Sequence, residues 1–167
     1  GNVTLLGYPV TDPRSRRGLG YVSESPTFSD YLTPLEILRM GTEIAGKRMV
    51  RRDQHCLGWL ERLGLREFAN TVVKGFSKGM IQRTALAHAL ALEPRLLILD
   101  EPLSGLDPLG RRDVVDILAE YRRQGGTIFL TSHVLHDVER LADRFGLIHK
   151  GCLSSVRSPA ELVGSDD

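Results

Sequence analysis

The stretch Leu96–Asp107, LLILDEPLSGLD, decides the fold. Four apolar residues run directly into two adjacent carboxylates, Asp100 and Glu101, and Pro102 ends the run. A short apolar run bounded by turn residues is typical of a strand buried on both faces of a parallel sheet. Such strands place charged residues at their carboxyl ends, where open α/β sheets bind ligands. Two like charges side by side need a cation or a proton if they are buried. The stretch therefore predicts either a metal–nucleotide site or a strand that ends in a solvated acidic turn.

Composition narrows the class of protein. The chain has 167 residues, which fits one domain with a substantial core, and it is 41% hydrophobic and 26% charged, which is ordinary for a globular protein. Its net charge of +1 gives no reason to expect nucleic acid or an anionic membrane surface as a partner. Cys56 and Cys152 have no CxxC spacing, so we expect free thiols in a reducing compartment. No apolar run approaches the length of a membrane span, so any membrane role would require other chains or segments.

Strands and helices alternate along the sequence. Strands are predicted at 3–6, 18–22, 96–100, 127–130, 145–148 and 153–156. Helices are predicted at 34–42, with Thr33, Pro34 and Glu36 forming a capping-box start, at 48–63, from Lys78 with Ser77 as its cap, from Pro108, and after Val134. This alternation predicts an α/β fold, a mostly parallel sheet with flanking helices, and a mainly helical lobe between Thr33 and Phe76.

Gly41–Arg48, GTEIAGKR, nearly matches the phosphate-binding pattern G-x-x-x-x-G-K-[ST]. That loop should follow a buried strand and end in a hydroxyl residue that reaches Mg²⁺. Here the preceding LEILRM is helical in pattern, and Arg48 has no hydroxyl. We therefore interpret the segment as a connection between two helices.

Chemistry-bearing residues follow two strands and precede one helix. Asp100 and Glu101 end one predicted strand, and His133 follows the next strand of the same sheet. Ser77, at a helix start, offers backbone N–H groups suited to an anion, although an ordinary capped helix has the same pattern. Phosphoryl transfer to water needs a cation, a positioned water and donors for the phosphate charge, and these residues can fill the three roles. A metal-ligating role for His133 and a nucleophilic role for Ser77 or Ser132 are weaker readings.

The order of four motifs resembles the nucleotide-binding domain of ATP-binding cassette (ABC) transporters. These motifs are FSKGMIQR (76–83), LLILDEP (96–102), SGLD (104–107) and TSH (131–133). The resemblance covers about Gly18 to Gly151, and the LDEP-x-SGLD run is highly specific. The motif FSKGM has Lys78 and Met80 where Gly and Gln are commonest in the family. It resembles the motif of the branch that exports drugs, lipids or polymers.

The resemblance implies a role for each matching residue. Asp100 corresponds to the Mg²⁺-associated Walker B Asp, Glu101 to the general base for the attacking water, and His133 to the switch His at the γ-phosphate. Ser77 and Gly79 belong to the signature motif, which contacts ATP held mainly by a second subunit. Residues 104–107 form the D-loop at the dimer interface, and Asp107 is included among the nucleotide-site residues.

Two departures from the family pattern follow. Glu24 stands where the family usually has the Gln that touches Mg²⁺ and senses the transmembrane partner, so we expect altered tuning rather than loss. The P-loop, its strand, its helix and the adenine-stacking aromatic should precede Gly1, so the chain looks like a piece of something longer. As it stands, the chain is not expected to hydrolyse ATP by itself.

The resemblance implies a P-loop NTPase-like fold and the following organisation. Residues 1–32 and 77–157 form the catalytic core, 33–76 the helical subdomain, and 158–167 a tail that frays at Gly164–Asp167. The expected function is that of an ATP-hydrolysing subunit that binds ATP and Mg²⁺ and powers export. Its partners would be a second nucleotide-binding domain, in a homo- or heterodimer, and a transmembrane permease. We expect it on the cytoplasmic face of the membrane, bound through that permease, with the coupling surface around Glu24–Tyr31. The alternatives are a soluble ABC ATPase of DNA repair or translation, and a non-catalytic interaction remnant.

Overall fold

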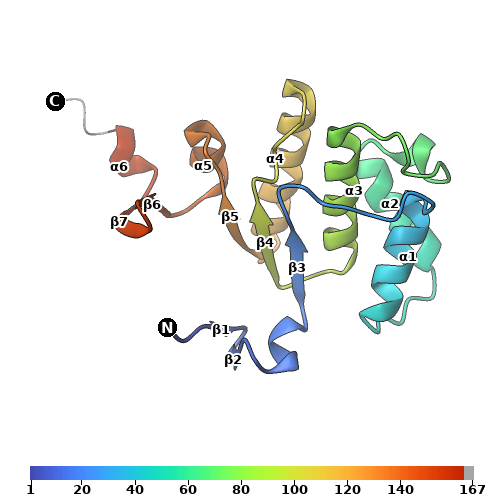
Figure 1. Ribbon diagram of the computed structural model, residues 1–167, viewed down its shortest axis with the longest axis horizontal. Coiled ribbons are helices and arrows are strands. Elements are labelled where there is room, and N and C mark those ends of the chain that lie inside the picture. Colours follow the sequence, from blue (N-terminus) through green and yellow to red (C-terminus); the bar gives the residue numbers. More distant parts are fainter. Residues whose placement is uncertain (164–167) are drawn as a thin grey trace. The chain divides into compact units, whose positions relative to one another are not determined.

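The chain divides into two compact units, Gly1–Thr131 and a second that begins at Ser132. The computed structural model describes residues 1–163, with the side chains at 135, 137, 138, 162 and 163 left out. Figure 1 shows the elements of the first unit. In chain order they are β1 (Thr4–Leu5), β2 (Tyr8–Pro9), the 3-10 helix η1 (Pro13–Arg16), β3 (Leu19–Val22), α1 (Pro34–Ile44), α2 (Arg52–Arg62), the 3-10 helix η2 (Arg66–Phe68), α3 (Lys78–Ala91), β4 (Leu96–Asp100), α4 (Pro108–Arg123) and β5 (Thr127–Thr131).

A three-stranded parallel sheet in the order β3-β4-β5 is the frame of the first unit. Leu97 of β4 pairs with Gly20 of β3 and with Ile128 of β5, so β4 is the central strand. Since all three strands are parallel, their carboxyl ends meet at one edge of the sheet. The predicted parallel arrangement of these strands is confirmed.

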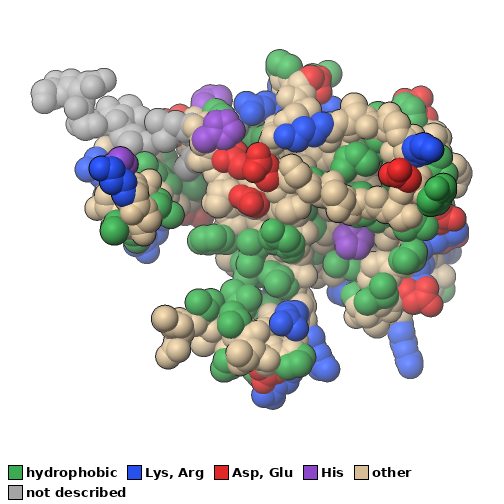
Figure 2. Space-filling view, in the orientation of Figure 1, with side chains coloured by type: hydrophobic (Ala, Val, Ile, Leu, Met, Phe, Trp, Pro, Cys, Tyr) green, Lys and Arg blue, Asp and Glu red, His purple; other side chains and the backbone are tan. Residues whose placement is uncertain are grey.

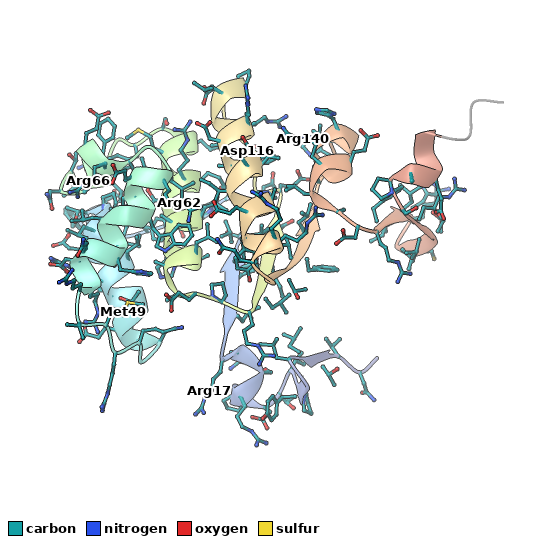
Figure 3. The ribbon with its side chains drawn as sticks, turned by 180° about the vertical axis from the view of Figure 1, so that it is seen from behind. Arg17, Met49, Arg62, Arg66, Asp116 and Arg140 are labelled. Atoms are coloured by element: carbon teal, nitrogen blue, oxygen red, sulfur yellow. The ribbon has the colours of Figure 1, made fainter. Side chains whose placement is uncertain are left out.

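The two faces of the sheet differ, and here the structure corrects the sequence. Alternate residues of β4, Leu97 and Leu99, are buried, whereas Leu96 and Ile98 are only half-buried. On the Ile98 face, Tyr21 is 58% exposed and Phe129 is 65% exposed. Helix α4 lies behind the strands in Figure 1 and in front of them in Figure 3, and hydrophobic side chains gather over the strands in Figure 2. The sequence predicts that β4 is buried on both faces. In the described part of the first unit, however, no helix covers the face that carries Ile98.

Local capping chemistry sets the helix starts as expected. The Thr33 side chain accepts a hydrogen bond from the Glu36 N–H, and the Glu36 carboxylate accepts one from the Thr33 N–H, so α1 begins with a capping box. Ser77 accepts a hydrogen bond from the Met80 N–H at 3.2 Å and caps α3. Both starts were predicted from the sequence and are confirmed.

The second helix begins later than predicted. We expected it from Arg48, but α2 starts at Arg52. Gly46, with φ of +70°, ends α1, and residues 47–51 form the connection that lets α2 fold back against α1. A start at Arg48 would place a run of arginines at the positive end of the helix dipole, whereas the observed start puts Asp53 in the first turn. Gly41–Arg48 is thus the end of one helix and a connection, as the sequence indicated.

Side chains from α2 join this helical region to α4. Figure 3 shows Arg62 extending from α2 toward α4, where it forms an ion pair with Glu120. The Arg62 guanidinium also lies 4.5 Å from the centre of the Trp59 ring. The interior of the first unit consists mainly of leucines and alanines of these helices and of β4; the largest buried apolar side chains are Leu38, Leu60, Leu65, Leu86, Leu90, Leu97, Leu99 and Leu118.

The first residues form a hairpin that the sequence did not predict. We expected a strand at 3–6 followed by a loop, but β1 and β2 pair in antiparallel fashion. The two residues between them, Leu6 and Gly7, have φ values of +51° and +86°. Positive φ at both central positions is typical of a tight two-residue hairpin turn.

The second unit contains α5 (Leu135–Leu141), β6 (Phe145–His149), β7 (Cys152–Arg157) and α6 (Ala160–Val163). Strands β6 and β7 form an antiparallel pair around the predicted Lys150-Gly151 turn. Cys152 is exposed, Cys56 of the first unit is buried, and both are free thiols. Burial raises the pKa of the Cys56 thiol. Among the described residues, no helix combines the length and the apolar character needed to cross a membrane.

The predicted division into subdomains stays a prediction. Residues 33–76 hold α1, α2 and η2, and no strand occurs among them. The predicted core, 1–32 with 77–157, includes elements of both compact units. The predicted fraying of the tail at 164–167 falls outside the described residues.

Candidate functional site

The acidic turn after β4 is held by a side chain of the neighbouring strand. Asp100 is the last residue of β4, and it pairs in register with Thr131, the last residue of β5. The Thr131 hydroxyl donates a hydrogen bond to Asp100 Oδ1 at 2.6 Å and accepts one from the Glu101 N–H at 3.1 Å. Glu101 has φ of +46°, a left-handed conformation that is uncommon for a residue with a side chain. Asp100 and Glu101 are both half-buried residues, and these hydrogen bonds make the turn structured rather than an open acidic loop.

A buried hydrogen bond joins the same turn to helix α3. Gln82, a fully buried residue of α3, donates from Nε2 to the carbonyl of Pro102 at 3.1 Å. Its other amide atom, Oε1, is buried and has no hydrogen-bond partner. Pro102, the residue that follows Glu101, is therefore held to α3 by the side-chain amide of Gln82.

The start of α3 packs against the loop after the acidic turn. Lys78 donates from Nζ to the Ser104 hydroxyl at 2.9 Å. A Cβ atom built on Gly79 would lie 2.9 Å from the carbonyl oxygen of Gly105, so only glycine permits this approach. Ser77 is exposed, directly ahead of the helix. The structure thus brings Gly79, in the helix that Ser77 caps, together with residues 104–107.

Asp107 lies at the end of that loop and caps α4 by position, since it precedes Pro108 at the first helical residue. Its carboxylate accepts a hydrogen bond from Arg83 of α3 at 3.0 Å. Asp107 is 62% exposed in its side chain, so this surface ion pair leaves an open face on the carboxylate. The interaction adds a further link between α3 and residues 104–107.

The remaining two expected residues are Glu24 and His133. Glu24 follows β3 by two residues, at the same edge of the sheet as Asp100, and is exposed. It forms no hydrogen bond or ion pair with any other described residue. His133 lies two residues beyond β5, in the second unit, and is exposed. Its expected role at a γ-phosphate stays a prediction.

The donor set at the acidic turn suits Mg²⁺ better than a metal held by the protein alone. No group of three or more His, Cys, Asp or Glu side chains among the described residues is arranged to hold an ion. Mg²⁺ is usually bound by one or two carboxylates, with waters and substrate phosphates completing its octahedron. Thr131 donates a hydrogen bond to Asp100 Oδ1, and no described residue bonds to Asp100 Oδ2. This arrangement fits a Mg²⁺ site whose other ligands are phosphate and water.

Sequence reasoning missed Thr131, Gln82 and Arg83 as members of this network. The TSH motif points to its histidine and assigns no role to Thr131. The signal available was its position at the end of a predicted strand beside the acidic one, but the register that pairs it with Asp100 is not written in the sequence.

Taken together, the parallel strands, the paired carboxylates at their ends and a capped helix packed on an SGLD loop define a P-loop NTPase-like α/β domain of the ATP-binding kind. A comparison with family models agrees, since residues 1–104 match the ABC transporter model. The chain belongs to the ABC transporter family of ATP-binding domains.

Similar proteins carry related names. An uncharacterized ABC transporter ATP-binding protein of Synechocystis is 38% identical over the whole chain, which covers 48% of that protein. An energy-coupling factor transporter ATP-binding protein of Symbiobacterium thermophilum is 45% identical over 97% of the chain and 59% of its own length. A bacitracin transport ATP-binding protein of Enterococcus faecalis is 37% identical over 86% of the chain and 46% of its own length.

A solved structure of the ATP-binding subunit of an ABC transporter has the same fold. It superposes with a TM-score of 0.86 at 30% identity, over 95% of this chain and 67% of that one. The predicted fold class is confirmed. The chain spans about half the length of the first curated relatives that it matches.

Proposed function

We propose that this chain is the catalytic part of an ATP-hydrolysing subunit of an ABC transporter, in which ATP hydrolysis powers movement of a cargo through a separate membrane protein. The observation that supports the proposal most strongly is the contact network of the first unit. In it, the Asp100–Glu101 turn, the Ser77 helix start and residues 104–107 are joined by side-chain hydrogen bonds. A solvated acidic turn would need none of these links.

Each of the expected site residues then has a role in hydrolysis. Glu101 orients the attacking water and accepts its proton. The left-handed backbone conformation at Glu101 sets the direction in which its side chain leaves the chain. Asp100 would hold Mg²⁺, directly or through water. The bound ion would supply positive charge against the charge that develops on the phosphate. His133 donates to the γ-phosphate, and Glu24 accepts from water near the metal.

The other wall of the site comes from a second nucleotide-binding domain. Ser77 and the backbone of Gly79 point their N–H groups and hydroxyl at the γ-phosphate of ATP held by that domain, since a helix start favours anions. Asp107, exposed at the end of the loop, contributes at the interface between the two domains.

The membrane partner docks on the segment around Glu24–Tyr31 and on the exposed side of α1. Tyr31 and Ile44 are each 82% exposed, and Met40 is 48% exposed. Exposed apolar side chains on neighbouring segments mark a surface for another protein. This contact would hold the subunit at the cytoplasmic side of the membrane.

Export is the direction that the FSKGM signature favours, because that wording resembles the exporting branch of the family. One relative is named for bacitracin transport. The cargo itself is set by the membrane subunit.

The test is Glu101→Gln in the full-length protein. The amide keeps the size of the side chain and cannot accept the proton from water, so turnover should fall by about 10²–10⁴. ATP binding and ATP-dependent dimerisation should persist, as measured by nucleotide binding and size-exclusion chromatography. Wild-type turnover in the variant would refute the role of Glu101, and absence of ATP hydrolysis in the unmodified protein would refute the proposed function.

A further inference from the structure

We infer that Thr131 is a positioning residue for both carboxylates of the catalytic turn, setting the Asp100 side chain and the Glu101 backbone through one hydroxyl group. This inference rests on the proposed function. It assigns a role to a residue that the motifs of the chain leave without one.

The polarity of the Thr131 hydroxyl is fixed by its two partners. A backbone N–H can only donate, so the hydrogen bond from Glu101 must end on a lone pair of Oγ1. The hydroxyl proton is then directed to Asp100 Oδ1, and the 2.6 Å separation is typical of a hydroxyl donating to a carboxylate. One side chain thus satisfies an acceptor and a donor on two adjacent residues.

This bridge determines how each carboxylate is presented. With Oδ1 held by Thr131, rotation of the Asp100 carboxylate is restricted, and Oδ2 bonds to no described residue. With its N–H held, Glu101 stays in the sparsely populated left-handed region, which needs support from its surroundings. Loss of the hydroxyl releases both constraints at once, although Thr131 touches neither substrate nor water in this role.

The position of Thr131 in the fold makes the bridge rigid. It is the last residue of β5, and its Cα pairs directly with that of Asp100 in the parallel ladder. Residues in register on adjacent strands lie within reach of one another's side chains. Thr127, four residues earlier, lies on the same face of the same strand and is also exposed, but it makes no side-chain hydrogen bond to a described residue. It is therefore a matched control position.

The experiment compares Thr131→Val, Thr131→Ser and Thr127→Val in the full-length protein. Valine keeps the shape and removes the hydroxyl, while serine keeps the hydroxyl and removes the methyl. Two readouts are needed: residue-resolved amide hydrogen exchange at Glu101, measured without nucleotide, and steady-state ATP hydrolysis as a function of Mg²⁺ concentration. Circular dichroism melting establishes that each variant folds, and Thr131→Ala replaces the valine variant if that one does not.

We expect Thr131→Val to speed amide exchange at Glu101 by about tenfold or more, because the N–H loses its acceptor. Maximal turnover should fall about 10–100-fold and half-activation should need more Mg²⁺, as for other residues that orient metal ligands. Thr131→Ser and Thr127→Val should remain close to the unmodified protein in both readouts.

Unchanged exchange at Glu101 in Thr131→Val, or a Thr131→Ser variant as defective as Thr131→Val, would overturn the inference. A fall in turnover with no change in Mg²⁺ dependence would also count against it, because a general loss of structure would produce that result. If the unmodified protein does not hydrolyse ATP, the proposed function fails while the exchange data still decide whether Thr131 holds the turn.

Discussion

Replacing Gln82 tests whether the link between α3 and the catalytic turn stabilises the fold or only positions the turn. Gln82 is fully buried, its Nε2 donates to the Pro102 carbonyl, and its Oε1 has no partner. A buried polar atom without a partner costs about 1–3 kcal/mol. Gln82→Met removes the unpartnered Oε1 but orphans the Pro102 carbonyl, so the two effects offset and the free energy of unfolding should change by less than about 1 kcal/mol.

Gln82→Ala is the matched comparison. It orphans the same carbonyl and also leaves a cavity, so it should cost about 2–4 kcal/mol. With a urea dependence of about 2 kcal/mol per molar for a chain of this size, the two variants should differ by about 1 M in midpoint. Trp59, the one tryptophan of the chain, reports the transition because its helix α2 packs against α3. A methionine variant destabilised as much as the alanine variant would refute the reasoning, since Oε1 would then have a favourable partner.

Two further predictions concern neighbouring parts of α3. Burial lowers the pKa of His88, so the unfolded state takes up a proton at a higher pH than the folded state. Stability should therefore be full above the ordinary histidine pKa of about 6.5 and should fall as the pH drops from there toward the folded-state value. Urea midpoints at pH 7.5 and 5.5 measure this fall, which should shrink in His88→Gln; an equal fall in both proteins contradicts it. Lys78→Met removes the donor to Ser104 but keeps the stem beside Gly105. Amide exchange at residues 104 and 105 should rise while the urea midpoint stays unchanged, and unaltered exchange would show that the exposed contact does not order the loop.

The features that the sequence predicted correctly are local ones. The capping box of Thr33 and Glu36 and the cap at Ser77 depend on residues three positions apart, so the pattern of side chains determines them. The strands β3, β4 and β5 follow from apolar runs bounded by turn residues. These elements alone suffice to place Asp100 at the carboxyl edge of a parallel sheet.

The features that the sequence did not give depend on register and on which face of an element is covered. The Thr131–Asp100 bridge requires the pairing between strands that are separated by α4, and periodicity leaves that register open. The contact of Gln82 with Pro102 depends on where α3 crosses the sheet. The half-exposed side of β4 depends on what covers the sheet, and an apolar run looks the same whether one face or two are buried.

The three links from α3 explain why stability and catalysis can be separated at Gln82. Lys78 and Gln82 lie on one side of α3, since they are spaced by four residues. Together with Arg83, they contact three points along the chain from Pro102 to Asp107. The start of α3 and the catalytic turn are therefore joined through one helix, so a shift of the helix start moves the Pro102 carbonyl, which follows Glu101. Gln82→Met removes the buried hydrogen bond to the Pro102 carbonyl and keeps the volume of the side chain. The variant is expected to unfold like the unmodified protein, because the two effects on the free energy of unfolding offset. If it then hydrolyses ATP more slowly, the buried amide serves to position Glu101.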